Sequence, residues 1–370
     1  MIYFDYSATT FPNKEVIKEF NFSMQKYVGN PNSSHRLGKL ARARIDDASI
    51  KIANILGVKP NEVIYTSGAS EANNLAIKGI CYANKGKHII TTKLEHSSVV
   101  APISRLVSLG YEVSFVNLKE DGTIDIEHLK SIIRNDTVLV SIVGVDSELG
   151  IRQNIEEVGL LLKNYPNCHF HVDATQLIGK TNYDFSNVDL FSFSAHKFFG
   201  IKGIGCLIKK ENIRLMPLID GGASTTKFRS GTPTLELIVS LEKALYLAYL
   251  DFNKKINYVK EISDDLKKFL SGYEGVTINN TEKSIPQIIN FSILGSDKIL
   301  ELLSDCGVFL SSKSACSNPD ALSKSIMALY NVIVRAEESI RISLSYVTTK
   351  KEIRQFKKIF DVCYKELHNK

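Results

Sequence analysis

Short runs of β-branched and aromatic residues alternate with amphipathic segments between about residues 60 and 210. Seven runs are strand candidates: EVIYT, HIITT, EVSFVN, TVLVSIVGV, HFHVD, LFSFSA and GCLIKK. Helical spacing fills most of the intervals, as in the segment from Ser97 to Leu109, which is followed by Gly110. Such alternation predicts an α/β protein with a mainly parallel sheet, helices on both faces, and ligands beyond the carboxyl ends of the strands.

The pattern changes after Gly231. A stretch without glycine or proline, from about Leu235 to Leu270, predicts one long helix that bridges to a second unit. From about Pro286, the strand candidates QIINFSI and VFLSS and a helical tail from Lys350 predict a smaller α/β domain.

Composition and charge exclude several classes of protein. With 370 residues, 44% hydrophobic and 23% charged, the chain is expected to be globular. The net charge of +6 is spread along the sequence, so we expect no direct contact with nucleic acid. No signal-like segment opens the chain, and no apolar run approaches the roughly 20 residues of a membrane helix. We therefore expect a soluble, cytoplasmic protein that does not contact a membrane.

The cysteines are scattered, without a C-x-x-C pair or a histidine at metal-ligand spacing. A zinc site or a disulfide framework is therefore not expected, and no metal is predicted. Five cysteines have apolar neighbours and are predicted to be core residues: Cys81, Cys168, Cys206, Cys306 and Cys363. Cys316 differs, because it lies in a polar, loop-like stretch between Leu310 and Pro319.

A small-residue turn joins a predicted strand to a predicted helix in TSGASEANNL, residues 66–75. Free backbone N–H groups and a serine hydroxyl at a positive helix end are typical of a phosphate site. Such turns are also common without a ligand, so this motif alone leaves both interpretations open.

Polar groups follow three later strands, in Glu95-His96, in HVDATQ and in SFSAHK. Asp173 closes an apolar strand, and a buried carboxylate needs a cation such as a protonated pyridine nitrogen. Lys197 follows a buried strand, where a lowered pKa would make its amine a nucleophile toward an aldehyde. His96 is suited to lie flat on a ring and to move protons, although a structural histidine at a strand end is the commoner case.

Together these strings resemble the cysteine desulfurases, in the class V aminotransferase branch of the fold-type I enzymes that use pyridoxal 5'-phosphate (PLP). The matching strings occur in family order: IYFDYSATT at the start, GNPNSSH at 29–35, TSGASEANNLAIKG at 66–79, EH at 95–96, HVDATQ at 171–176, SFSAHK at 192–197, RSGT at 229–232, SSKSACS at 311–317 and RISLS at 341–345. The resemblance implies a fold-type I PLP-dependent transferase with a mainly parallel seven-stranded sheet. It also implies a large PLP-binding domain over residues 15–255, and a small domain over 1–14 and 256–370 that carries the catalytic cysteine.

The resemblance also implies residue roles. Lys197 would hold PLP as a Schiff base, His96 would stack on the ring, and Asp173 would pair with the pyridine nitrogen. Further cofactor contacts would come from Gln176 at the phenolate oxygen and from Ala69, Ser70, Ser194 and His196 at the phosphate. Thr232 would serve the phosphate site of a neighbouring subunit, which implies a homodimer.

The substrate-binding residues implied by the family are Asn30 and Arg341, the latter pairing with the substrate carboxylate. Cys316 would take the sulfur of L-cysteine as a persulfide and leave L-alanine. The chain departs from the family in Asp146-Ser147-Glu148, where Asn-Asn-Glu is usual, so Ser147 stands where an asparagine bonds the phenolate oxygen. Other departures are Lys313 and Ser345 in place of glycine, and Thr225-Thr226 in place of Glu-Arg.

The sequence thus predicts a PLP-dependent cysteine desulfurase that passes sulfur to an acceptor protein it cannot name, in iron–sulfur cluster or thio-tRNA type pathways. One alternative is another PLP enzyme of the same fold: a selenocysteine lyase, a β-eliminating lyase or an aminotransferase. A second alternative is a weakly active homologue that acts as a partner in a sulfur-transfer assembly. The presence of Lys197, Asp173 and Cys316 together counts against a pure scaffold, which has no chemical need for all three.

Overall fold

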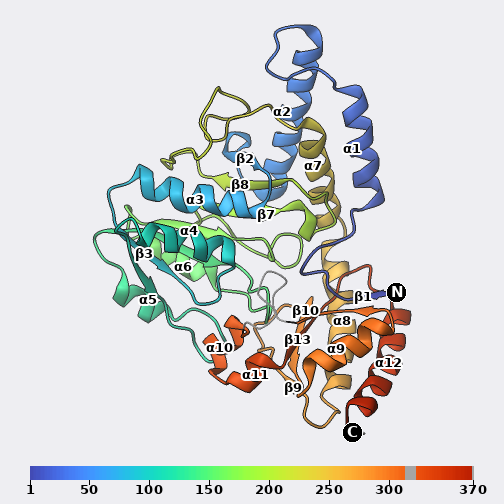
Figure 1. Cartoon of the computed structure of the whole chain (residues 1–370). Helices are drawn as coiled ribbons and strands as arrows, with labels where there is room; N and C mark the ends of the chain where they lie inside the picture. The colour runs from blue at the N-terminus through green and yellow to red at the C-terminus, as the bar shows by residue number, and fades with distance from the viewer. Residues whose placement is uncertain (313–321, 369–370) are drawn as a thin grey trace.

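The computed structural model describes residues 1–312 and 322–368. Its largest element is a seven-stranded sheet in the order β2-β8-β7-β6-β5-β3-β4 (Figure 1). The strands are β2 Val63–Thr66, β3 His88–Thr91, β4 Glu112–Phe115, β5 Thr137–Val143, β6 His169–Asp173, β7 Leu190–Ser194 and β8 Gly205–Lys209. Strand β8 is antiparallel to β2 and β7, and every other pair is parallel. All seven predicted strands are therefore present, and the mainly parallel sheet is confirmed.

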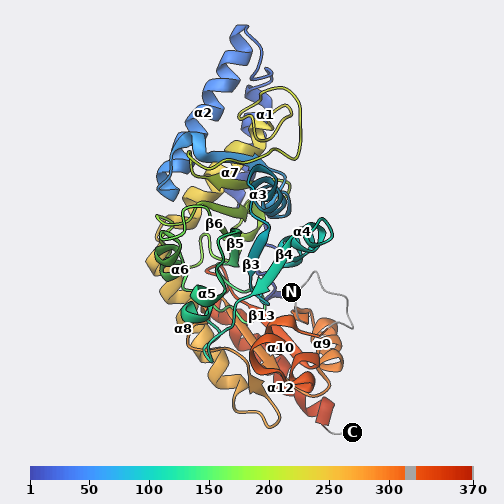
Figure 2. The same cartoon turned by 90° about the vertical axis from the view of Figure 1, so that its left-hand side faces the viewer.

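Helices cover both faces of this sheet because its buried strands are apolar on both sides. On β7, Phe191 and Phe193 join a core with α2 (Arg36–Leu56), α6 (Ile155–Leu162) and α7 (Leu235–Tyr249). Leu190 joins a second core with α3 (Ala69–Ala83) and α4 (Ser97–Val107). Figure 2 shows α2 extending beyond the sheet together with α1 (Lys14–Lys26). A short helix, α5 (Ile126–Ile132), precedes β5.

The expected long helix is two helices. Helix α7 ends at Tyr249, and α8 spans Phe252–Leu270. Asp251 between them has a φ of 53°, in the left-handed region that aspartate enters more readily than most residues. A break of this kind needs no glycine or proline, so the sequence pattern did not reveal it.

The second unit is built on a four-stranded antiparallel sheet in the order β12-β13-β10-β9. Its strands are β9 Thr277–Ile278, β10 Ile288–Ser292, β12 Ser311–Ser312 and β13 Ser339–Ser343. Its helices are α8, α9 Ser296–Asp305, α10 Lys324–Tyr330, α11 Ile333–Glu337 and α12 Lys350–His368. The predicted strands in QIINFSI and VFLSS and the predicted terminal helix are present, whereas β9 and β13 were not foreseen.

The N-terminal residues belong to this second unit in space. Strand β1 (Ile2–Tyr3) pairs in parallel with β11 (Val308–Phe309), and Phe4 is buried in the same core as Phe356 of α12. Figure 1 accordingly shows the N-terminus beside the C-terminal elements. The domain boundaries at 15–255 stay a prediction.

Four of the five cysteines that we predicted to be core residues are buried. Cys306 is exposed, and that prediction was wrong. It follows the last residue of α9 as the cap, where the apolar face of the helix no longer directs it inward. Cys316 lies outside the described residues. Within 1–312 and 322–368, no helix is long and apolar enough to cross a membrane.

Candidate active site

A cavity of about 410 Å³ lies at the carboxyl ends of the central strands, where open α/β sheets place their ligands. Ten of the predicted site residues line it: Ala69, Ser70, His96, Ser147, Asp173, Gln176, Ser194, His196, Lys197 and Arg341. Residues from β6, β7, α3 and β13 therefore converge, although they are far apart in the sequence. The structure thus brings most of the predicted site together.

Asp173 ends β6 and is only 3% exposed. Its carboxylate accepts hydrogen bonds from Asn73 Nδ2 at 2.8 Å and from the Thr175 backbone N–H at 3.0 Å. A buried carboxylate that opens onto a cavity favours a cationic group there.

His96 caps the N-terminus of α4. Its Nδ1 accepts the backbone N–H of Ser98 at 3.1 Å and lies 2.8 Å from Ser98 Oγ. Burial lowers the pKa of His96, and the Lys197 and Lys324 cations lower it further, against the opposing effect of Asp173. The ring is therefore neutral at pH 7, and the capping bond places its proton on Nε2.

Lys197 follows β7 in a single 3-10 turn, Ala195–Lys197. Its Nζ donates to the carbonyl oxygens of Ser7 at 2.8 Å and Ala8 at 2.9 Å. Thr10 holds the turn from both sides, because its Oγ1 donates to His196 O at 2.9 Å and accepts Phe199 N–H at 2.8 Å. The N-terminal segment thus positions the lysine, a role that the sequence did not reveal beyond the motif YSATT.

The start of α3 faces the cavity with Ala69 and Ser70, and its cap residue, Gly68, makes no capping side-chain bond. The approach of β8 to this turn requires Gly205, because a Cβ there would lie 2.5 Å from Phe193 O and 2.7 Å from Gly68 Cα. Backbone N–H groups of an uncapped helix N-terminus, next to the Ser194 hydroxyl, form a suitable site for an anion.

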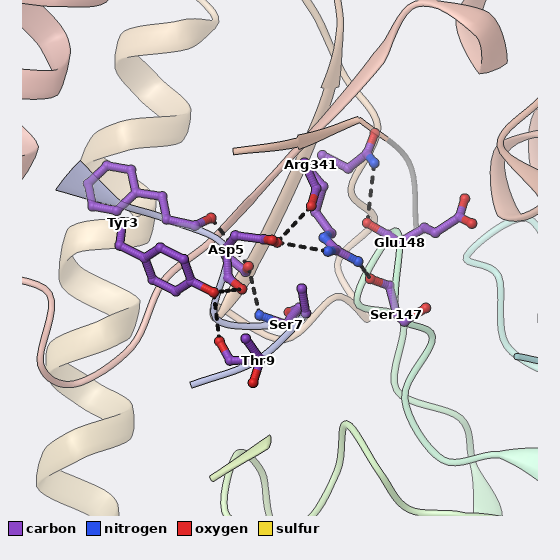
Figure 3. Close-up of polar contacts among 12 residues, drawn as sticks. Tyr3, Asp5, Ser7, Thr9, Ser147, Glu148 and Arg341 are labelled. Carbon is purple, nitrogen blue, oxygen red and sulfur yellow. Dashed lines mark hydrogen bonds and ion pairs between the residues drawn. The ribbon is translucent and has the colours of Figure 1, made fainter. Parts of the chain in front are cut away.

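Arg341 of β13 is 1% exposed and reaches the cavity from the second unit. Figure 3 shows its guanidinium between two partners: Nη1 donates to Ser147 O at 2.8 Å, and Nη2 pairs with Asp5 Oδ1 at 3.0 Å. Its Nε is buried without a partner among the described residues. The arginine expected to bind a substrate carboxylate thus already shares its charge with Asp5, and only two of its five N–H groups are bonded in these two contacts.

Two buried carboxylates flank Ser147: Asp146, which replaces the first asparagine of Asn-Asn-Glu, and Glu148, which keeps the family glutamate. Asp146 Oδ1 accepts from Ser325 Oγ at 2.7 Å, and Glu148 accepts from Ser323 Oγ. Burial raises the pKa of Asp146 and raises that of Glu148 to about 7. These residues attach the start of α10 to the loop after β5, a function that the sequence did not suggest.

Two of the predicted site residues that the structure describes are not in the cavity. Asn30 and Thr232 are exposed and do not line it, so their roles stay predictions, as does the homodimer that Thr232 would imply. Cys316 lies outside the described residues. Among the residues described, no group of three or more His, Cys, Asp or Glu could hold a metal ion.

The residues of the cavity fit PLP. Asp173 is a buried anion for the ring nitrogen, Lys197 supplies an amine for the aldehyde, and the start of α3 supplies donors for the phosphate. His96 lines the same cavity as a neutral ring. These residues suit an aldehyde cofactor that carries a positive charge at one end and a negative charge at the other.

The comparison with protein families agrees with the conclusion that the cavity fits PLP. The model of the aminotransferase class-V family matches residues 2–356, which gives the class of the chain. It is 38% identical over 364 residues to the cysteine desulfurase IscS of Dictyoglomus turgidum, covering 95% of this chain and 91% of that protein. It is 37% identical over 374 residues to the NifS/IcsS protein homolog of Lactobacillus delbrueckii subsp. bulgaricus, covering 98% and 97%. The chain therefore belongs to the cysteine desulfurases of the aminotransferase class-V family.

Solved structures agree with the fold. The chain superposes on a NifS-like protein with a TM-score of 0.91 at 31% identity, covering 98% of this chain and 99% of that one. It superposes on SspA in complex with cysteine with a TM-score of 0.84 at 30% identity, covering 94% and 100%. These likenesses confirm the predicted fold-type I architecture.

Proposed function

We propose that this protein is a PLP-dependent cysteine desulfurase that converts L-cysteine to L-alanine and transfers the sulfur to Cys316 as a persulfide. One observation carries the proposal: Asp173 ends β6, Lys197 follows the neighbouring strand β7 after one short turn, and both line one cavity with Arg341. An amine nucleophile, a buried anion and a carboxylate-binding cation in one cavity are what an amino-acid substrate and PLP together require. The names of the relatives support cysteine as that substrate.

When bound, PLP supplies a sink for the electron pair of the substrate's α-carbon. Asp173 would keep the ring nitrogen protonated, because a buried carboxylate favours a neighbouring positive charge. His96, neutral with its proton on Nε2, would cover the ring and exchange protons near the reacting atoms. Lys197 would bind the cofactor and, once released by the substrate amine, would move the α-proton.

Arg341 would orient the substrate through its carboxylate, using the unpartnered Nε and the remaining Nη hydrogens. The thiolate of Cys316 would then attack the sulfur of the substrate. In balance, L-cysteine and the enzyme thiol give L-alanine and the enzyme persulfide: the carbon–sulfur bond of the substrate breaks, a sulfur–sulfur bond forms, and the thiol proton goes to alanine. No external oxidant or reductant is needed for this step.

The assembly and pathway extend the same proposal. A homodimer would let the exposed Thr232 contact the cofactor phosphate of the partner subunit. The persulfide would pass to a sulfur-acceptor protein in an iron–sulfur cluster or thio-tRNA type pathway, and a cytoplasmic location stays a prediction.

The test is to incubate the purified PLP-loaded protein with L-cysteine and to measure alanine, pyruvate and sulfide, with and without dithiothreitol. Alanine and sulfide in equal amounts with the reductant are expected. Without it, mass spectrometry should find one added sulfur on the peptide containing Cys316. Pyruvate and ammonia in place of alanine would indicate a β-eliminating lyase, and a keto acid with cofactor in the amine form would indicate an aminotransferase. Conversion of selenocysteine but not cysteine would indicate a selenocysteine lyase.

Cys316→Ser tests the role of the thiol. The variant should still bind PLP and L-cysteine but release almost no alanine or sulfide, because a hydroxyl does not accept sulfur from a thiol. Cys306→Ser is the matched control, since Cys306 is an exposed cysteine outside the cavity and its loss should leave turnover unchanged. Near-normal turnover by Cys316→Ser would remove Cys316 from the reaction.

A further inference from the structure

Lys180 is a buried lysine for which the proposed chemistry has no use. It is 9% exposed and lies one turn after Gln176, in the loop that follows β6. Its Nζ donates to Gln176 Oε1, and in the described part of the chain no aspartate or glutamate forms an ion pair with it. Burying an amine without a carboxylate is costly, so a specific function is needed to explain it.

Lys180 lines a second, smaller cavity of about 40 Å³, whereas Gln176 lines the larger one. Lys197 lines both cavities, whereas Lys180 lines only the smaller one. The other titratable groups around the smaller cavity are Lys255, Tyr6 and Tyr346, and none of its lining residues within the described chain is acidic. Burial lowers the pKa of Lys180 well below its usual value, and the cations of Lys197 and Arg341 lower it further.

The amide of Gln176 is held at both ends. Its Nε2 donates to Ser7 O at 2.8 Å, and its Oε1 accepts from Lys180. Ser7 O also accepts from Lys197 Nζ at 2.8 Å, so one carbonyl joins the amide to the catalytic lysine. A backbone carbonyl only accepts, so the amide nitrogen must face Ser7, and the oxygen faces Lys180.

We propose that Lys180 is a positioning residue, which acts through Gln176: its amine fixes the amide so that the second N–H of Nε2 points toward the phenolate oxygen of PLP. This inference rests on the proposed function, which assigns PLP to the larger cavity. Without the amine, Gln176 Oε1 becomes a buried acceptor with no partner, and the amide turns or moves to find one. The hydrogen bond to the phenolate oxygen then weakens.

The cofactor itself reports this change. PLP held by Lys197 would share one proton between its phenolate oxygen and the nitrogen of the lysine. A hydrogen bond donated to that oxygen withdraws charge from it and weakens its hold on the proton, so loss of the bond raises the pKa of the chromophore. A role confined to folding would leave that pKa unchanged.

The experiment is a pH titration of the visible absorbance of the PLP-loaded enzyme, for wild type and Lys180→Met. We expect the midpoint of the variant to lie higher by about 0.5 pH or more, which is about a threefold change in the acid constant. The KM for cysteine should change less than kcat, because Gln176 does not contact the substrate carboxylate in this scheme. If Lys180→Met does not fold, Lys180→Gln replaces it, because glutamine is also polar. The same rise in the midpoint is expected, since the glutamine side chain is one atom shorter than that of lysine.

Lys209→Met is the matched control. Lys209 is also buried, and its Nζ donates to Lys210 O at 2.9 Å and Ile213 O at 3.0 Å, but it does not line the cavity. The pH midpoint of the Lys209→Met variant should equal that of the wild type. Gln176→Leu completes the cycle: with Gln176 absent, the Lys180→Met change should shift the midpoint no further, because non-additivity marks action through one group.

The outcomes separate this inference from the proposed function. A wild type that takes up no PLP, or takes it up without converting cysteine, refutes the proposed function. A wild type that does both, with a Lys180→Met midpoint equal to its own or a Lys209→Met midpoint shifted equally, refutes only the positioning role. The positioning role is also refuted if Lys180→Met shifts the midpoint by the full amount in the Gln176→Leu background. The amine of Lys180 would then act on the cofactor through its charge and not through Gln176.

Discussion

Replacing Arg341 with alanine is expected to weaken the binding of L-cysteine far more than that of PLP. The side chain is 1% exposed, and its guanidinium bonds Ser147 O at 2.8 Å and Asp5 Oδ1 at 3.0 Å. Its Nε is buried without a partner among the described residues, and each Nη has a second hydrogen besides the one in these contacts. The alanine variant therefore loses the substrate clamp and leaves Asp5 without its cation.

The size of the effect follows from the geometry. Truncating one partner of a buried, hydrogen-bonded charge pair costs about 2–5 kcal/mol. Asp5 already neutralises part of the charge on Arg341, so the lower half of that range applies. A loss of about 2–3 kcal/mol raises KM by about 30- to 150-fold, since each 1.4 kcal/mol or so is a factor of ten.

The assay measures KM and kcat for L-cysteine from alanine formation, together with PLP content from visible absorbance. Arg341→Lys is the control, because lysine keeps the positive charge but cannot make the bidentate contact of a guanidinium. Its KM should lie between those of the wild type and Arg341→Ala. The thermal midpoint of each variant reports the cost of leaving Asp5 unpaired. A KM for Arg341→Ala within about threefold of the wild type, with PLP bound, would refute the substrate role.

Two further predictions concern Lys197 and Glu95. Lys197→Ala should lose the visible absorbance that survives dialysis in the wild type, because only a covalent bond keeps the aldehyde on the protein; dialysed absorbance equal to wild type would point to another lysine. Burial raises the pKa of Glu95 to about 8, above its value near 4.5 in the unfolded chain. The protonated carboxyl therefore stabilises the folded state fully below about pH 4.5, and this stabilisation is lost as the pH rises toward 8. Chemical unfolding at several pH values should show this decline in the wild type and a flatter profile in Glu95→Gln, and parallel profiles would contradict it.

The sheet and the lysine were accessible from local patterns. Each of the seven strands appears as a short apolar run in the sequence; Asp173 ends one of them, and Lys197 follows another after one short turn. Because carboxyl ends of parallel strands meet at one edge, their place in the chain implied their place in space. The same local reasoning failed at Asp251, where a left-handed backbone ends α7 without any glycine or proline, and at Cys306, which apolar neighbours did not bury.

The hydrogen-bond and ion-pair partners of the site residues come from distant parts of the chain. Asp5 and Arg341 are 336 positions apart, and Lys197 is held by Ser7 from 190 positions away. No periodicity or spacing encodes such pairs, because they form only when the first residues join the sheet of the last ones.

By itself, the sequence determined the class of the protein, its mainly parallel sheet, and the places of Asp173 and Lys197 at or just after the ends of two strands. Only the tertiary structure decided that Asp5 shares the charge of Arg341, that Asp146 and Glu148 hold α10, and that Lys180 faces Gln176. The physical reason is one of range: strand and helix patterns arise from neighbours a few residues apart, whereas the hydrogen bonds and charges of a buried site are set by whichever segments the whole fold brings against it.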